Sequence, residues 1–306
     1  MDATPSVPLP PDAESGIAAH PPAPLTIGRT TFTWGERTYV MGIINVTPDS
    51  FSGDGLLTEG GDTIESALRQ ALAMAAEGAD LLDIGGQSTR PGHQPVSVPD
   101  ELARVRPVVE AVRAALPDMP LSIDTTSAAV AQAALEGGAD LVNDVWGTEA
   151  ERQLLDVVAR RGVPLVLMHN RAEARYRNVV AEVLADLSRA IDVALGAGIA
   201  WERLIVDPGI GFGKTPAHNL ALLHDLHMLS ALGRPVLLGT SRKSTIGKVL
   251  DLPAGQRLEG TLATTALGVG AGVDIVRVHD VAANVRAARM ADAIVRGGWH
   301  DQGAHR

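Results

Sequence analysis

Cysteine is absent from the 306-residue sequence. Its absence excludes disulfide bonds, thiolate nucleophiles and metal sites with cysteine ligands, and it leaves the redox compartment open. The sequence also lacks a basic N-terminal region followed by an apolar run, and no window approaches 18 uninterrupted apolar residues. We therefore expect a soluble cytoplasmic protein that does not bind a membrane.

Positive charge is in the minority. Lys and Arg number 26 against 36 Asp and Glu, a formal net charge of −10. This balance disfavours non-specific binding to nucleic acid. A local cluster of Arg, Lys and backbone N–H groups can still bind a small anion, because charges beyond about 8 Å are screened. A small-molecule anion site is therefore compatible with the composition, and a nucleic-acid partner is not expected.

Proline is concentrated at the N-terminus, where residues 1–25 hold seven of the 19 prolines. Proline at this density blocks both helices and strand ladders. We predict a disordered tail over 1–25, with a Pro-rich docking ligand as the alternative. Hydrophobic residues make up 45% of the chain, enough for a sizeable core, and residues 26–306 are expected to form one domain.

Apolar runs alternate with amphipathic helical patterns from there to the C-terminus. Eight such runs are predicted strands: 39–45, 79–86, 120–124, 139–145, 163–169, 203–209, 234–240 and 273–279. Most are continuously apolar, as expected for parallel strands that are buried on both faces. Eight β-then-α units predict an α/β fold of the (β/α)8 TIM barrel type, with a doubly wound open sheet as the rival.

Each predicted strand gives way to polar, glycine-rich sequence at its C-terminal end, and in a parallel barrel these ends share one rim. Helix capping explains Ser, Thr, Asp and Asn there, but it does not require Arg, Lys or His. A rim active site explains all of them. The rim residues are Asn45, Gln87, Ser88, Thr89, Arg90, Asp124, Asn143, Asp144, Met168, His169, Asp207, Ser241, Arg242, Lys243, Arg277 and His279.

The charges on this rim indicate two kinds of contact. Arg277 and His279 are two residues apart on one strand, so both side chains face the same way and favour an anion. Asp124, Asn143 and Asp207 offer oxygen acceptors suited to the paired N–H edge of a guanidine-like or pterin-like ring. The rim is therefore expected to present an anion pole and a heterocycle pole.

Seven segments, in this order, resemble the motif series of the dihydropteroate synthase family: MGIINVTPDSFSGDG, DIGGQSTRPG, SIDTTSAAVAQAALEGGADLVNDVWG, VLMHN, DPGIGFGKTPAHNLALL, GTSRKSTIG and VRVHD. The resemblance extends over roughly residues 38–290. It implies a homodimeric TIM barrel that joins p-aminobenzoate to 6-hydroxymethyl-7,8-dihydropterin diphosphate. Pyrophosphate is released, dihydropteroate is formed for folate synthesis, and Mg²⁺ accompanies the diphosphate.

The resemblance also implies roles for individual residues. The pterin ring is expected to contact Asp124, Asn143, Val145, Met168, Asp207, Phe212 and Lys243. The diphosphate is expected to contact Asn45, Arg90, Arg277 and His279, with Asn45 also a magnesium ligand. The p-aminobenzoate pocket and its loops are expected to include Phe51, Asp54, Ser88, Thr89, Pro91 and Ser244.

Family members are thought to react in a dissociative, SN1-like way, with no covalent protein nucleophile. Loss of diphosphate builds negative charge on oxygen and positive charge on the pterin methylene carbon. The expected catalytic residues are Asp207, Lys243, Arg277 and His279. Loops 46–56 and 86–98 are rich in Gly, Pro and Ser, and we expect them to exclude water from the cation.

The sequence departs from the family pattern in three places: Gln87 replaces the usual Glu, HNRAEARYRN follows the fifth strand, and Asp54 comes one residue late. These departures affect loop geometry and the p-aminobenzoate and sulfonamide sites. A corrinoid-type pterin methyltransferase and a catalytically silent pterin-binding paralogue are the alternatives. The first has no diphosphate to hold, and the second is expected to have lost anion-binding residues.

Two further patterns favour ordinary structural roles. GFGKTP at 211–216 lacks the spacing of a nucleotide-binding P-loop. His218, His224 and His227 lack a supporting carboxylate pattern, so we expect a helical surface and not a metal cluster.

Overall fold

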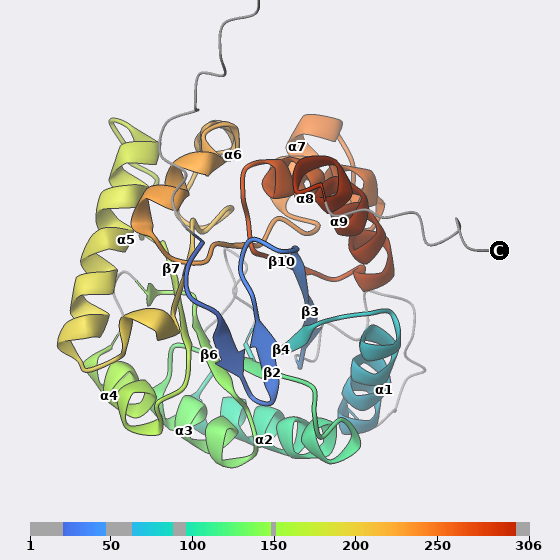
Figure 1. Cartoon of the computed structure of the whole chain (residues 1–306). Coiled ribbons are helices and arrows are strands. Elements are labelled where there is room, and N and C mark those ends of the chain that lie inside the picture. The colour runs from blue at the N-terminus through green and yellow to red at the C-terminus, as the bar shows by residue number, and fades with distance from the viewer. Residues whose placement is uncertain (1–20, 47–62, 88–95, 148–150, 298–306) are drawn as a thin grey trace, which may run out of the picture.

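A computed structural model describes residues 21–46, 63–87, 96–147 and 151–297. Its core is a sheet of eight parallel strands (Figure 1) in the order β8-β7-β6-β5-β4-β3-β10-β9. A bridge between Val206 and Val236 joins the two ends of this sheet. The strands are β3 (Tyr39–Asn45), β4 (Leu81–Gly85), β5 (Leu121–Asp124), β6 (Leu141–Asp144), β7 (Leu165–Met168), β8 (Leu204–Asp207), β9 (Leu237–Leu238) and β10 (Ile275–Val278). The TIM barrel is confirmed, and the open sheet is excluded.

Helices ring the barrel and return the chain to the next strand. They are α1 (Thr63–Ala76), α2 (Val98–Ala115), α3 (Ala128–Glu136), α4 (Arg152–Arg161), α5 (Val179–Gly196), α6 (Pro216–His224), α7 (Ser244–Leu250), α8 (Leu258–Gly270) and α9 (Val281–Val295). Ser97, Ser127, Asn178 and Thr215 cap the starts of α2, α3, α5 and α6 by accepting backbone N–H groups. No helix in the described part of the chain is both long enough and apolar enough to cross a bilayer.

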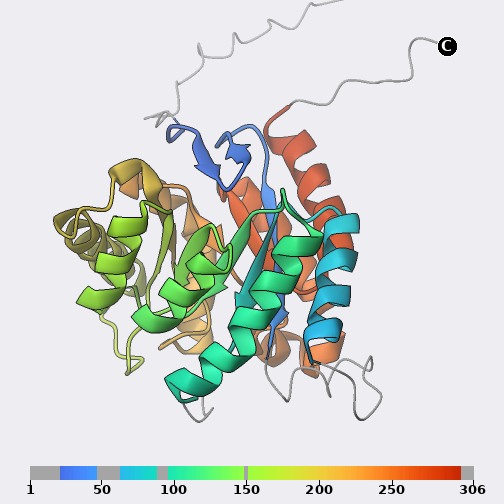
Figure 2. The same ribbon diagram turned by 90° about the horizontal axis from the view of Figure 1, so that it is seen from below.

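Strand alternation sends every second side chain into the barrel. The inward positions nearest the N-terminal ends of the strands are apolar. They form one cluster with a short hairpin of β1 (Leu25–Ile27) and β2 (Thr30–Phe32). Leu25, Ile27, Phe32 and Trp34 are buried there, and the hairpin closes the end of the barrel where the strands begin (Figure 2). The apolar floor therefore leaves only the opposite rim for polar chemistry.

The hairpin was not predicted, because each of its strands has three residues and no alternating run is long enough to register. It also corrects the boundary of the expected tail, because Leu25 already belongs to β1 and is buried. Residues 1–20 lie outside the described residues, so the predicted disorder of that segment stays a prediction.

Candidate active site

Three of the expected catalytic side chains converge above Gly239, the inward position that follows β9. A Cβ atom placed on Gly239 would lie 3.8 Å from Lys243 Nζ, 3.9 Å from Arg277 Cβ and 3.9 Å from Asp207 Oδ2. These residues follow β9, lie on β10 and end β8, three strands that adjoin around the barrel. The acid and the two cations therefore belong to one site, as the sequence predicts.

Asp207 serves both as a turn former and as an acceptor at the site. Its Oδ1 accepts the Gly209 N–H at 2.7 Å, which shapes the turn after β8, and Oδ2 lies on the side of Gly239. Burial raises the pKa of Asp207, and the positive charges of Lys243 and Arg277 oppose the rise. These cations hold a negative charge where it can accept N–H groups from a ligand.

Arg277 reaches past β3 and binds two carboxylates inside the barrel. Its Nε donates to Asp83 Oδ2 at 2.6 Å and its Nη2 donates to Asp124 Oδ2 at 2.8 Å. Asn143 Nδ2 donates to the same Asp83 oxygen at 3.1 Å. Burial raises the pKa of Asp124, and Arg277 opposes this shift. We call Asp83, Asp124, Asn143 and Arg277 the central acid network.

Asp83 is a site residue that sequence reasoning missed. It lies inside the apolar run predicted as a strand at 79–86, and it is fully buried in the middle of β4. The sequence does contain one signal for Asp83: it is the single carboxylate within a strand that is buried on both faces. A buried charge needs a partner, and this one required a cation from another strand.

Lys243 faces the loop that follows β8. Its Nζ donates to the Ile210 carbonyl oxygen and lies 4.5 Å from the centre of the Phe212 ring. Burial lowers the pKa of Lys243 to about 8, although Asp207 opposes the shift. Lys243 thus connects the acid of the site to the aromatic side chain expected against the pterin.

His279 follows β10 and pairs with the loop after β9. Ser241 Oγ accepts the His279 backbone N–H at 3.1 Å and lies 2.9 Å from His279 Nδ1. With the Ser241 hydroxyl donating to Nδ1, the ring proton is on Nε2. Arg242, the residue after Ser241, forms an ion pair with Asp280 at 2.6 Å and joins the same two loops.

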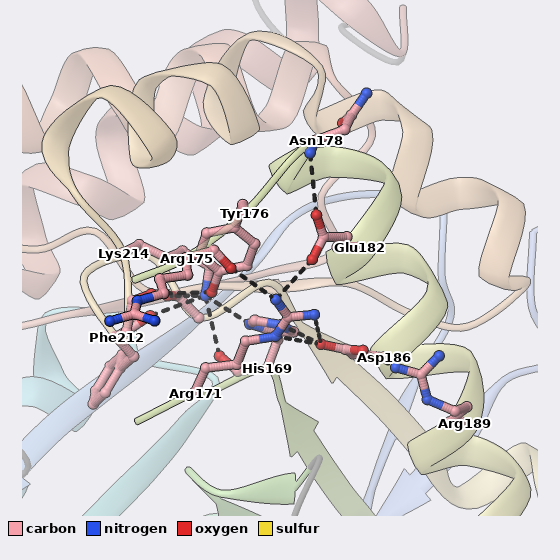
Figure 3. Close-up of polar contacts among 12 residues, drawn as sticks. His169, Arg171, Arg175, Tyr176, Asn178, Glu182, Asp186, Arg189, Phe212 and Lys214 are labelled. Atoms are coloured by element: carbon pink, nitrogen blue, oxygen red, sulfur yellow. Dashed lines mark hydrogen bonds and ion pairs between the residues drawn. The ribbon is translucent and has the colours of Figure 1, made fainter. Parts of the chain in front are cut away.

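The loop after β8 is also tied together, and to His169, by its own residue Lys214 (Figure 3). Lys214 Nζ lies 2.7 Å from His169 Nδ1 and donates to the carbonyl oxygens of Gly209 and Phe212, each at 3.0 Å. Burial lowers the pKa of Lys214 to about 7 and that of His169 to about 4. A neutral His169 ring can therefore accept from the ammonium group.

Asp186 on α5 completes this cluster. It lies 3.0 Å from His169 Nε2 and 2.7 Å from Arg171 Nη2, and it also binds Arg189. The carboxylate accepts the Nε2 proton and so leaves Nδ1 unprotonated toward Lys214. We call His169, Arg171, Asp186 and Lys214 the loop lysine network. Sequence reasoning treated His169 only as a rim residue, and it missed the other members.

Of the remaining site residues expected from the sequence, four are described by the structure and six are not. Val145 and Met168 are buried, Ser244 is the exposed first residue of α7, and Asn45 ends β3 partly exposed. Their expected contacts with substrates stay predictions. The expected loop residues Phe51, Asp54, Ser88, Thr89, Arg90 and Pro91 lie outside the described residues.

The described residues give little support for a metal site built from protein side chains alone. They contain no group of three His, Cys, Asp or Glu side chains placed to hold an ion. His218 belongs to the capping box of α6, and the His224 side chain is exposed, in agreement with the helical surface predicted for them.

Comparison with known proteins agrees with this geometry. A family described as pterin binding enzyme matches residues 41–279. The dihydropteroate synthase of Clostridium beijerinckii is 48% identical over 273 residues, which cover 89% of this chain and 100% of that protein. The Bacillus subtilis dihydropteroate synthase is 47% identical and covers 89% of this chain and 94% of its own length.

Solved structures give the same result. Xanthomonas albilineans dihydropteroate synthase with 4-aminobenzoic acid superposes with a TM-score of 0.83 at 45% identity, covering 89% of this chain and 98% of that one. The Clostridium difficile dihydropteroate synthase structure with pteroic acid superposes with a TM-score of 0.82 at 46% identity, covering 87% and 99%.

Proposed function

The chain belongs to the family of pterin-binding enzymes, and from this premise we propose that it is a dihydropteroate synthase. It joins p-aminobenzoate to 6-hydroxymethyl-7,8-dihydropterin diphosphate, forms 7,8-dihydropteroate and releases pyrophosphate. This activity makes it a transferase of folate biosynthesis. The observation that carries the proposal is the convergence of Asp207, Lys243 and Arg277 within 4 Å of one point above Gly239.

Asp207 and Asn143 are assigned to the ring. The Asp207 carboxylate can accept from the amino and ring N–H groups of a pterin through two parallel hydrogen bonds, one to each oxygen, because Oδ1 has a second lone pair besides the one that accepts the Gly209 N–H. Val145, Met168 and Phe212 supply apolar walls for the ring. A negative charge fixed beside the ring favours the positive charge that develops on its methylene carbon.

Arg277 and His279 are assigned to the diphosphate. When the bond to the methylene carbon breaks, negative charge develops on the departing oxygen, and preorganised donors stabilise it, each by about 2–4 kcal/mol by analogy with oxyanion holes. Arg277 supplies guanidinium protons, and His279 supplies Nε2–H while Ser241 occupies Nδ1. Lys243 is placed to assist from the ring side.

A magnesium ion fits this arrangement as a companion of the diphosphate. Mg²⁺ usually keeps several waters and binds through substrate phosphates with only one or two protein oxygens, so a protein cage is not needed. The Asn45 side chain, for which no polar partner is found among the described residues, would supply such an oxygen. When bound, the ion would neutralise charge on the leaving group.

We extend the proposal to a homodimer formed through the last two helices. Large apolar side chains are exposed there: Leu267 on α8 at 73%, and Met290 and Ile294 on α9 at 63% and 71%. The two helices pack side by side on the barrel (Figure 1), and an exposed apolar patch of this kind favours association. The cytoplasmic location expected from the sequence stays a prediction.

The direct test combines purified protein, Mg²⁺, the pterin diphosphate and labelled p-aminobenzoate, and separates the products by chromatography. We expect labelled dihydropteroate together with one equivalent of pyrophosphate. Binding of the pterin without any product would favour the silent paralogue. Methyl transfer from a methylated pterin would favour the methyltransferase.

A further inference from the structure

Asp83 occupies a position where a carboxylate is costly. It lies on β4 between the floor residue Leu81 and the rim residue Gly85, and its side chain is 0% exposed. Its Oδ1 has no hydrogen-bond partner among the described residues. A buried ion pair is often no more stabilising than apolar residues of the same volume. Stability alone therefore does not account for an aspartate here.

The contacts of Oδ2 link the two poles of the site. This single oxygen accepts from Arg277 Nε at 2.6 Å and from Asn143 Nδ2 at 3.1 Å. The first partner is assigned to the diphosphate and the second to the ring. Arg277 arrives from β10, Asn143 lies on β6, and Asp83 is on β4 between them in the sheet order.

We propose that Asp83 is a positioning residue that sets both Arg277 and Asn143 for the reaction. Because Asp83 holds Nε–H and Asp124 holds one Nη2 proton, the remaining guanidinium protons are directed to other acceptors such as the leaving diphosphate. This inference rests on the proposed function, and it adds a residue that the motif resemblance did not assign.

The effect on Asn143 concerns specificity. An ionised carboxylate only accepts hydrogen bonds, so the group that Asn143 turns toward Asp83 must be its NH₂. The Asn143 carbonyl oxygen then faces elsewhere as an acceptor, which suits a ring N–H and not a ring carbonyl. Asp83 thereby settles an amide orientation that the side chain of Asn143 does not determine by itself.

The test compares wild type with Asp83→Asn and Asp83→Ala, and uses Asp118→Asn, whose side chain is 76% exposed, as the matched control. We measure kcat and KM for each substrate, binding of 6-hydroxymethylpterin by fluorescence, and unfolding in urea. Residues that orient the ligands of a metal site typically contribute about 10- to 100-fold to affinity or activity, and we take this range by analogy. We expect about 100-fold lower kcat for Asp83→Ala and about 10-fold for Asp83→Asn, which keeps an oxygen in place but loses the charge.

Two readouts separate positioning from a purely structural role. Affinity for 6-hydroxymethylpterin should fall in both variants while KM for p-aminobenzoate stays within about 2-fold, and the urea midpoint of Asp83→Asn should remain near that of wild type. Asp83→Asn decides the question if Asp83→Ala does not fold. Wild-type kcat and pterin affinity in Asp83→Asn would overturn the proposal, as would unfolding of both variants. An inactive wild-type enzyme would refute the proposed function instead.

Discussion

Two buried polar clusters act on Asp207, and they differ in how completely their hydrogen bonds are satisfied. In the loop lysine network, Lys214 has the acceptors of His169, Gly209 and Phe212 for its three protons, and Asp186 binds three cationic or N–H groups. In the central acid network, Asp83 Oδ1 has no partner and Arg277 uses two of its five protons on described residues.

This difference separates scaffold from site. A network whose donors and acceptors are all satisfied by protein contributes rigidity, because nothing is left to bind. A network with spare donors near a rim can accept a ligand. Burial raises the pKa of Asp207, and Arg277 of the central acid network and Lys214 of the loop lysine network both oppose this rise. Among the described residues, only the central acid network retains unused hydrogen-bonding groups. The two networks should therefore respond differently to substitution.

The largest effect on stability is expected from Gly209→Ala. This substitution breaks the loop lysine network where the backbone of Gly209 approaches the backbone of His169 most closely. Gly209 has φ +67°, and a Cβ there would lie 1.8 Å from the His169 carbonyl oxygen. We expect a loss of about 3 kcal/mol or more in the free energy of unfolding, measured in urea. Gly198→Ala is the matched control, because Gly198 also has positive φ but no atom within 4 Å. Equal losses in both variants would contradict the close approach.

Lys214→Met tests whether the ammonium group holds the loop. The substitution removes the Lys214 donor from the Phe212 carbonyl oxygen, and it leaves the Gly209 oxygen with only the Phe212 N–H. An unpaired buried group costs about 1–3 kcal/mol. We expect a loss of about 2–3 kcal/mol in the free energy of unfolding. The exposed Lys248 provides the control Lys248→Met, which should change stability by less than about 0.5 kcal/mol. Similar curves for the two variants would show that Lys214 does not hold the loop.

His169 makes the same network sensitive to acid. Its pKa is lowered from 6.5 to about 4, first by burial and then by Lys214. The unfolded state therefore binds more protons between these values, so stability that is present above pH 6.5 is lost as the pH falls toward 4. Relative to His169→Asn, the wild type should lose on the order of 3 kcal/mol across this window. Parallel pH profiles of unfolding would mean that His169 is not held neutral.

The smallest effect is expected at an exposed ion pair outside both networks. Arg29 and Asp118 are 2.7 Å apart, but their side chains are 74% and 76% exposed. Solvent screens such pairs, so Arg29→Ala should change the free energy of unfolding by less than about 0.5 kcal/mol. A larger change in thermal or urea unfolding would show that distance alone, without burial, decides the contribution of an ion pair.

Much of the fold and part of the site could be predicted from the sequence. Periodicity identified all eight barrel strands, because each is a buried run followed by a helix pattern, and the polar strand ends placed Asp207, Lys243 and Arg277 on one rim. Partners from distant strands could not be predicted: Asp83 and Arg277 are 194 positions apart, and only closure of the barrel brings them together.

The loop lysine network was missed for a related reason. Lys214 lies in a glycine-rich turn that has the composition of an ordinary loop, and its burial depends on the close approach of His169. The hairpin that closes the barrel was missed because its strands are too short to show a period. Contacts that depend on tertiary packing account for the two missed networks, and the shortness of its strands accounts for the missed hairpin.

The most direct test of the two-pole site compares Asp207→Ala with Arg277→Ala, measuring 6-hydroxymethylpterin affinity and kcat for each. Asp207→Ala should abolish ring binding. Arg277→Ala should lower kcat by about 10²–10³-fold, as for loss of a transition-state donor, with a smaller change in ring affinity. Equal and small effects of the two substitutions on both quantities would contradict the assignment of separate ring and diphosphate poles.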